Sequence, residues 1–159
     1  MTAPTARPVR ASQVTMTELV LPNDTNQLGN LLGGRLMHWI DIAAAIAAQR
    51  HSGMVCVTAS VDELVFLEPI RLGQVVTLHA SVNRAFTTSM EVGVLVSMHG
   101  LGDAPPRRAN YSYLTFVALD AAGHPARVPP LLPETEDEKR RFDEALRRRE
   151  LRLQHRSAM

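Results

Sequence analysis

The sequence predicts a single α+β domain in which an antiparallel sheet curls around one central helix, with a second helix on the surface at the C-terminal end. Two observations predict this fold class. A stretch near residue 40 is apolar on almost every face of a helix, so it must be wrapped by other elements. Four β-rich runs with short connections follow it, and they supply the wrapping. With 159 residues, 45% hydrophobic and 21% charged, the chain has the size and balance of one globular domain.

Composition and charge exclude several classes of protein. The chain carries 17 basic and 16 acidic residues, and only 4% of its residues are aromatic. It offers neither a broad phosphate-binding field nor a platform for stacked bases, so we expect no nucleic acid partner. The longest apolar run, residues 42–48, is far shorter than the ~20 residues of a membrane helix, so we expect no membrane partner. The single Cys56 and the absence of a hydrophobic leader predict a cytoplasmic protein.

The N-terminal region divides at residue 13. Two prolines and two arginines among residues 1–12 predict a disordered lead-in. The apolar pattern of residues 13–21 predicts a strand, which the turn chemistry of residues 22–24 ends. The main domain is therefore expected over residues 13–133.

The central helix and the sheet strands follow in sequence order. Eleven of the thirteen residues over 36–48 are apolar, which predicts a buried helix from Arg35 to about His51. The four β-rich runs are separated by Gly, Pro or Asn, and consecutive strands with short connections are most simply antiparallel. We expect them at residues 54–66, 75–82, 89–99 and 111–119.

Residues 134–159 are predicted to form a C-terminal helix and tail. Thr135 and Glu138 have the spacing of a capping box, and acidic residues crowd the first turn while arginines crowd the end. These arginines have two interpretations: a solvated face that complements the helix dipole, or part of a phosphate site. Phe142, Leu146 and Leu153 form a narrow apolar stripe, so the helix is expected on the surface or against a neighbouring subunit.

Asp41 is the most informative residue, because a carboxylate in the middle of a buried helix is costly unless something pairs or uses it. One interpretation is structural: a narrow wet stripe, or a pair with Arg35 or His38. The other is a general base, because loss of solvation improves the ability of a carboxylate to take a proton from water.

Gly33 and Gly34 lie where the central helix should begin. Free backbone N–H groups at a helix start can hold a developing oxyanion, although a turn that merely needs glycine explains the pair as well. Gly33 and Asp41 are eight residues apart, or ~12 Å of helix. One helix can hardly bring both to one carbonyl, so a shared site would combine elements of two subunits.

Asn26 lies in a polar loop just before the glycines. Its side chain both donates and accepts, which suits the positioning of a water or the binding of a carbonyl. The alternative is an Asx-turn in which the side chain satisfies its own backbone. Cys56 lies between two valines of a predicted strand, and we interpret it as a buried, inert thiol.

Five segments in one order resemble the hotdog-fold acyl-CoA thioester hydrolases. The resemblance covers roughly residues 15–145, and its tail resembles the C-terminal segment of the eukaryotic tandem cytosolic enzymes. The segments are LPNDTNQLGNLLGGRLMHWID (21–41), VTASVD (57–62), FLEPIRLG (66–73), TSMEV (88–92) and VPPLLPETEDEK (128–139).

The resemblance implies the hotdog fold and a set of site residues. Asp41 matches the family's catalytic carboxylate and Asn26 matches its polar partner, which the family draws from a second hotdog unit. One unit in this chain implies a homodimer, assembled further into a homohexamer as a trimer of dimers. Thr88 and Ser89 match residues near coenzyme A, and Phe86 stands where many members have Gly.

The predicted function is hydrolysis of an acyl-CoA thioester to a free carboxylic acid and coenzyme A. Gly33 and Gly34 would hold the carbonyl oxygen while Asp41 activates a water that Asn26 positions. No general acid is required, because a thiol with a pKa of ~8.5 leaves readily as thiolate, so one carboxylate and an oxyanion hole are enough. No cofactor is expected, and the coenzyme A thioester is itself the substrate. The sequence leaves open whether Asp41 acts as a base or attacks directly to form an anhydride.

Two rival functions use the same pocket. A non-catalytic acyl-CoA binding or sensing protein would need neither Asp41 nor Asn26. A hotdog enoyl-CoA hydratase is expected to have a DxN loop and a catalytic His three residues after it. This chain has Gly29 at that position. For the phosphates of coenzyme A, we favour Arg107 and Arg108, expected in the loop before the last strand, over the arginines of the terminal helix.

Overall fold

A computed structural model describes residues 4–158, and for Glu63 only the backbone. Its main elements follow the predicted order: a first strand, a long helix, four long strands and a second helix at the end. They are β1 (Arg7–Pro8), η1 (Val9–Ser12), β2 (Val14–Leu19), η2 (Pro22–Asp24), α1 (Gly33–Ser52), β3 (Val55–Phe66), β4 (Val75–Ala85), β5 (Ser89–His99), β6 (Arg107–Leu119), β7 (Leu131–Leu132) and α2 (Glu136–Ala158).

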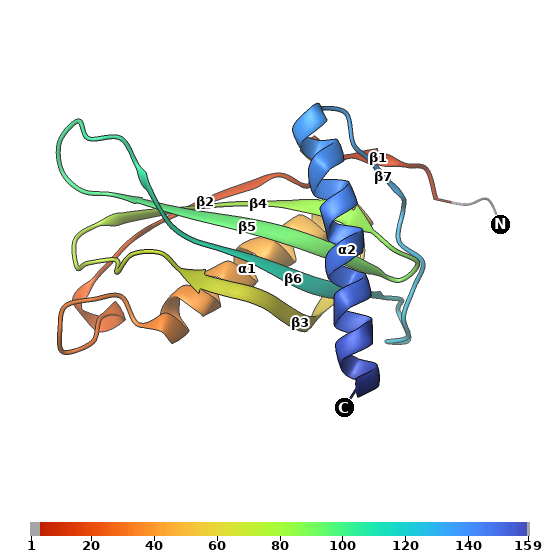
Figure 1. The fold of residues 1–159 in the computed structure, drawn as a ribbon, viewed down its shortest axis with the longest axis horizontal. Coiled ribbons are helices and arrows are strands. Elements are labelled where there is room, and N and C mark those ends of the chain that lie inside the picture. Colours follow the sequence, from red (N-terminus) through yellow and green to blue (C-terminus); the bar gives the residue numbers. More distant parts are fainter. Residues whose placement is uncertain (1–3, 159) are drawn as a thin grey trace.

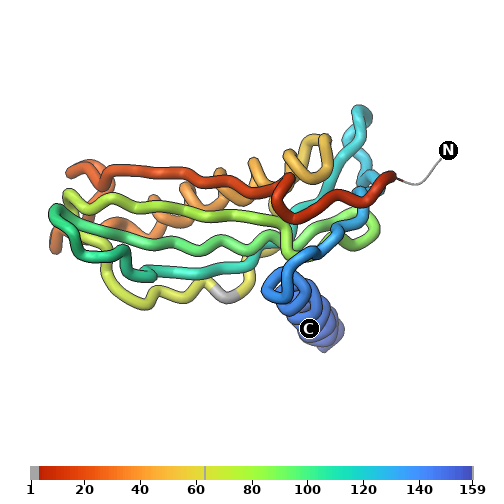
Figure 2. Tube along the Cα trace, turned by 90° about the horizontal axis from the view of Figure 1, so that it is seen from above, coloured from red at the N-terminus to blue at the C-terminus, as the bar shows by residue number. Residues whose placement is uncertain are grey.

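Five strands form one antiparallel sheet in the order β2-β4-β5-β6-β3. Figure 1 shows α1 behind this sheet and α2 in front of it, and Figure 2 shows α2 projecting from the sheet at one end. We call the face under α2 the outer face. The predicted fold class, an antiparallel sheet around one central helix with a C-terminal surface helix, is confirmed. Within residues 4–158, neither helix is long and apolar enough to cross a membrane.

Small side chains let the sheet approach α1 closely. Ala43, Ala44, Ala47 and Ala48 are all fully buried. Strand alternation presents the core-facing side chains of β4, β5 and β6 to this alanine surface, and each residue removed from water contributes roughly 25 cal/mol per Å² of apolar area. The helix ends where Gly53, at φ 70°, adopts the left-handed conformation and donates its N–H to Gln49 O.

The predicted disorder of residues 1–12 is wrong for residues 7–12, which form β1 and η1. Residues 1–3 lie outside the described residues. β1 pairs in parallel with β7, and Val9 is buried in the core. Ser12 Oγ donates to Val9 O and accepts from Val82 N–H, which ties the segment to β4. The guanidinium of Arg7 also donates to the carbonyls of Arg50 and His51, so the segment is held at several points.

The last strand begins earlier than predicted. β6 starts at Arg107, which pairs with Met98, and Arg108 pairs with Ser97. Both arginines therefore belong to the sheet rather than to the preceding loop.

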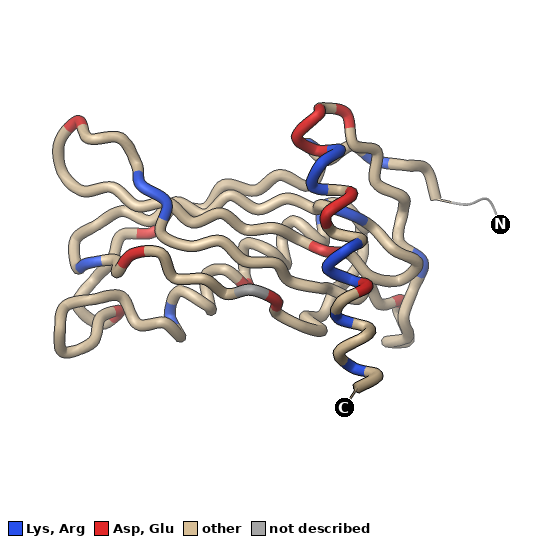
Figure 3. Tube along the Cα trace, viewed as in Figure 1, with Lys and Arg blue, Asp and Glu red and all other residues tan. Residues whose placement is uncertain are grey.

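The capping box at the start of α2 is formed as the spacing indicates. Glu138 N–H donates to Thr135 Oγ1 at 3.1 Å, and Thr135 N–H donates to Glu138 Oε1 at 3.3 Å. Figure 3 shows acidic residues at the beginning of α2 and basic residues toward its end. The helix charges thus complement its dipole.

Candidate active site

Asp41 is held by a neighbour that the sequence reasoning did not assign a role. Thr58, on β3, donates its Oγ1 to Asp41 Oδ1 at 2.6 Å. No described side chain bonds to Oδ2 of Asp41, which is half-buried. The carboxylate is therefore fixed through one oxygen and can accept a proton through the other. The VTASVD segment already contained Thr58, but only the packing of β3 against α1 reveals its partner.

The proposed structural pair of Asp41 with Arg35 is not present. Arg35 Nε instead lies 3.2 Å from Asp24 in the loop before α1. Asp24 also accepts from Leu21 N–H at 2.9 Å, so it organises the turn at the beginning of this loop. Arg35 therefore ties the first turn of α1 to that loop and leaves Asp41 to Thr58.

Gly33 and Gly34 are the first two residues of α1, as the oxyanion interpretation requires. No side chain caps this helix start within the described residues, and the first helical bond is donated by Leu36 N–H to Leu32 O. Neither glycine has a positive φ, so the backbone does not demand glycine here. A Cβ on Gly34 would meet nothing within 4 Å, so the space beside this helix start is open.

Asn26 uses its side-chain oxygen within its own loop. Oδ1 accepts from Leu28 N–H at 2.9 Å and from Asn30 N–H at 3.1 Å, so the Asx-turn interpretation is confirmed. This does not remove the residue from the site, because the turn fixes the side chain. The Nδ2 amide has no hydrogen-bond partner among residues 4–158 and can still donate.

A cleft of about 420 Å³ lies at the start of α1. Asn26 and Gly33 line it together with apolar side chains from the end of β3 and the segment that follows, and Asp41 does not. The remaining lining residues are Asn30, Leu31, Leu36, Phe66, Leu67, Glu68, Pro69 and Ile70. Within one copy of the chain, the structure brings the asparagine and the glycine together and leaves the carboxylate apart.

The residues expected to contact coenzyme A fall into two groups. Thr88 and Ser89 lie at the turn into β5, whereas Arg107 and Arg108 pair with the opposite end of that strand. Arg107 lies 2.8 Å from Glu68, so its charge is already paired. Arg108 has no hydrogen-bond or ion-pair partner among the described residues.

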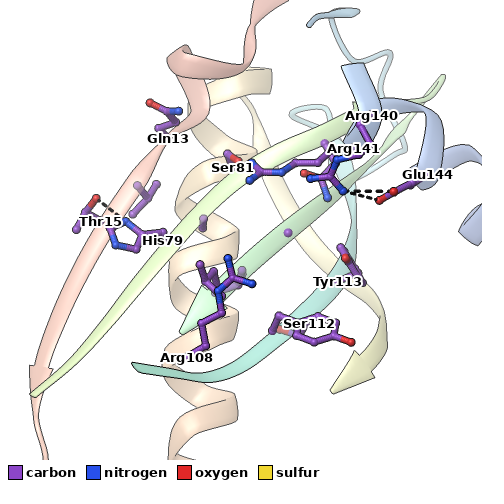
Figure 4. A pocket seen from close by; sticks show the side chains of 17 residues that line it. Gln13, Thr15, His79, Ser81, Arg108, Ser112, Tyr113, Arg140, Arg141 and Glu144 are labelled. Atoms are coloured by element: carbon purple, nitrogen blue, oxygen red, sulfur yellow. Dashed lines mark hydrogen bonds and ion pairs between the residues drawn. The ribbon is translucent and has the colours of Figure 1, made fainter. Parts of the chain in front are cut away.

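Arg108 borders a second cavity, of about 600 Å³, on the outer face of the sheet. Figure 4 shows Arg108 among the side chains that line this cavity, with Arg140, Arg141 and Glu144 reaching it from α2. Arg140 is bound to Glu144 and Arg141 to Asp137, so those guanidinium groups are compensated.

Arg148 and Arg149 of α2 belong neither to a solvated face nor to a phosphate site. Arg148 binds the fully buried Glu91 through two nitrogens, at 2.7 and 3.0 Å, and its guanidinium lies 3.6 Å from the ring centre of Tyr113. Arg149 lies over Phe86 at 4.2 Å, which gives the departure from the family's Gly a role in packing. These arginines dock the helix rather than face solvent.

Cys56 is half-buried and in contact with Ser52 Oγ at 3.3 Å. Burial raises the pKa of its thiol, which disfavours the nucleophilic thiolate. The structure agrees with an inert cysteine.

The comparisons with known proteins point to one family. A family described as the thioesterase superfamily matches residues 28–98. Acetyl-coenzyme A thioesterase of Mus musculus is 35% identical over 92% of this chain, and the uncharacterized acyl-CoA thioester hydrolase YkhA of Bacillus subtilis (strain 168) is 41% identical over 100% of it. The chain spans 26% of the mouse protein and 94% of YkhA.

Solved structures extend the likeness to three dimensions. An acyl-CoA hydrolase of Staphylococcus aureus, in complex with butyryl coenzyme A, coenzyme A and coenzyme A disulfide, is 40% identical with a TM-score of 0.91, over 96% of this chain and 93% of that one. Variants of that enzyme with alanine at an asparagine, an aspartate or a threonine are similar too. An apo-hexameric acyl-CoA thioesterase is 39% identical with a TM-score of 0.92, over 98% and 99% of the two chains.

Proposed function

This chain belongs to the thioesterase superfamily, within the hotdog-fold acyl-CoA hydrolases that its sequence resembles, and on that premise we propose that it hydrolyses acyl-CoA thioesters at a site completed by a second copy. The observation that carries the proposal is the hydrogen bond from Thr58 to Asp41, on the same helix whose uncapped start holds Gly33 and Gly34.

In the proposed reaction, Asp41 takes a proton from a water that attacks the thioester carbonyl carbon. The N–H groups of Gly33 and Gly34 receive the developing oxyanion. The C–S bond then breaks, and coenzyme A leaves as a thiolate that takes up a proton, while the acyl group becomes the free carboxylic acid. Thr58 keeps one carboxylate oxygen occupied, so the other is aimed at the water. No step needs a cofactor.

Asn26 is assigned to the water or to the carbonyl through its Nδ2 amide. Its Oδ1 is engaged by two backbone N–H groups, which hold the amide in a single orientation. A donor fixed in this way loses little rotamer freedom when substrate binds, and this favours a positioning role.

The geometry of β3 supports a site shared by two copies. The beginning of β3 carries Thr58 beside Asp41, whereas its end carries Phe66, whose ring would lie 3.7 Å from a Cβ on Gly33. β3 is an edge strand of the sheet with exposed valines. Antiparallel pairing with β3 of a second copy sets the beginning of one strand against the end of the other. Asp41 of one copy then faces Asn26 and the glycines of the other.

The S. aureus enzyme supports the same three residues. Its alanine variants are separated by 15 positions from asparagine to aspartate and by 17 from aspartate to threonine. Asn26, Asp41 and Thr58 have the same separations in this chain. The hexameric relatives support further assembly, which we propose as a trimer of dimers.

For coenzyme A we propose contacts to Thr88, Ser89, Arg107 and Arg108. Because the two pairs lie near opposite ends of β5, which spans about 30 Å, no single copy presents both to one nucleotide. We therefore assign the pairs to different copies. Arg108 is the stronger phosphate candidate, since Glu68 already neutralises Arg107.

A complementation experiment tests the shared site. Asn26→Ala and Asp41→Ala are each expected to be inactive, but in a mixed dimer one of the two sites regains both residues. Random exchange makes half of the dimers mixed, so turnover of butyryl coenzyme A should recover to roughly a quarter of the wild-type value.

The matched control mixes Asp41→Ala with Thr58→Ala. These residues belong to the same half of the site, so exchange restores no intact site and no activity should return. Recovery in the control, or none in the test pair after exchange is verified, would contradict the shared site. A wild-type chain without turnover on any coenzyme A ester from acetyl to palmitoyl would contradict the activity itself.

A further inference from the structure

Helix α2 crosses the strands of the outer face instead of running along them. At Phe142 it lies over β4, where Arg84 covers the phenyl ring at 3.9 Å. Arg148 reaches β5 and β6 through Glu91 and Tyr113. These contacts come in the spatial order of the strands, β4-β5-β6.

The crossing ends at the edge of the sheet. Arg152 binds Asp62, which lies on β3, the edge strand. Phe142 and Arg152 are ten residues apart, or ~15 Å of helix, and three strand spacings of ~4.8 Å amount to ~14 Å. α2 thus lies nearly perpendicular to the strands and arrives at the edge at Arg152.

Residues 153–158 continue the helix beyond that edge. We call them the overhang. Six residues extend ~9 Å, or about two strand widths, past β3. Figure 1 shows this end of α2 projecting past β3, and every residue of the overhang is exposed. A helix end that leaves its own sheet has no tertiary contact to stabilise it.

The overhang and the turn before it carry apolar side chains. Leu151 is 64% exposed and Leu153 is 45% exposed. Leu153 lies four residues after Arg149, which contacts the sheet, and seven after Leu146, so it flanks the docked side of the helix. Gln154 lies on the opposite side, toward solvent.

We propose that the overhang packs on a second copy of this chain, against the outer face of its sheet and beside its α2. This rests on the proposed pairing through β3, which would continue the sheet under the overhang by the two strand widths that it spans. The twofold symmetry of such a pair makes the contact reciprocal, so the two α2 helices run antiparallel across the joint. Leu153 lies at the centre of this contact, and α2 clasps the dimer on the face opposite the active sites.

The experiment compares the full-length chain with three variants by sedimentation over a dilution series. A chain ending at Arg152 keeps the contacts of Phe142, Arg148 and Arg152 with the sheet but lacks the overhang. Leu153→Asp places a carboxylate on the docked flank, and Gln154→Asp places the same group on the solvent side as a matched control. Thermal unfolding of each variant verifies that it is folded.

The truncation and Leu153→Asp are expected to raise the dimer dissociation constant at least tenfold, while Gln154→Asp stays within twofold of the full-length chain. Equal dissociation constants for all four would overturn the clasp. That result would leave the proposed function standing if the full-length chain still turns over acyl-CoA as a dimer. A monomeric full-length chain that retains turnover would overturn both the clasp and the shared site.

Discussion

The two helices of this protein lie on opposite faces of one sheet and are held there by opposite means. α1 buries alanines against the core-facing side of the strands, and no ion pair holds it to the sheet within the described residues. α2 buries only Ala145 among its described residues and docks through arginines that meet a buried carboxylate and aromatic rings. Glu91 holds α2 on the sheet through Arg148, whereas Asp41, the single carboxylate of α1, forms no ion pair with any described residue that would hold its helix.

The number of partners separates a functional charge from a structural one. Glu91 is saturated: Asn83 Nδ2 donates to it at 3.0 Å, and Arg148 binds both of its oxygens. Asp41 accepts one bond, from Thr58, and stays half-buried. A buried charge with every partner in place stabilises a contact, whereas an under-coordinated one is available for chemistry.

The largest expected effect tests the functional side of the comparison. Asp41→Asn should lower kcat for acyl-CoA hydrolysis by ~10² to 10⁴, the usual contribution of a positioned base. The fold should survive, because a neutral amide suits the apolar helix at least as well. Steady-state kinetics and circular dichroism check the two parts. Activity within threefold of the wild type would remove Asp41 from the mechanism.

Arg148→Ala tests the structural side. It leaves Glu91 buried without its cation, which costs about 3–5 kcal/mol in the free energy of unfolding. Arg147→Ala, one residue earlier on the exposed side, should change that free energy by no more than ~0.5 kcal/mol. Urea titrations measure both. A loss below 1 kcal/mol for Arg148→Ala would mean that α2 does not depend on this pair.

The C-terminal end of α1 holds a buried titratable group that makes stability pH-dependent. His51 is fully buried, its Nε2 donates to Pro129 O at 2.7 Å, and burial lowers the pKa of the imidazole. The unfolded chain therefore binds more protons than the folded one below about pH 6.5, so the free energy of unfolding should fall as the pH falls through that value. His51→Gln, which can donate the same bond, should flatten this slope. An unchanged slope in the variant would assign the pH dependence to other groups.

The smallest expected effect concerns the phosphates of coenzyme A. Arg108→Ala should raise KM about two- to threefold at low salt with kcat unchanged, because a remote phosphate contact contributes equally to the ground state and the transition state. High salt should erase the difference, since exposed charges are screened within ~8 Å at physiological ionic strength. Arg127→Ala, another exposed arginine, is the control. Identical KM values for the two variants would assign Arg108 to the solvated surface.

Much of the candidate site was readable from the chain because its signals are local. Asp41 interrupts an apolar helix, and Gly33 and Gly34 stand at its start, so the helical pattern made them candidates and the family resemblance gave them roles. Thr58 could not be selected in this way, because one threonine in a strand is ordinary until the register of β3 against α1 is known. Arg148 was misjudged for the same reason: Glu91 lies 57 residues away in the sequence.

The order of the elements, the burial of α1, the capped start of α2 and the family were all predictable from the amino-acid sequence, because hydrophobic periodicity, turn residues and short-range hydrogen bonds act within a few residues. Which charges meet depends on the packing of the folded chain. It ordered residues 7–12 through Val9 and Ser12, moved Arg107 and Arg108 onto a strand, and turned the arginines of α2 inward onto the sheet. Those outcomes depend on which strands lie side by side, and contacts between residues far apart in the chain leave no periodic signal.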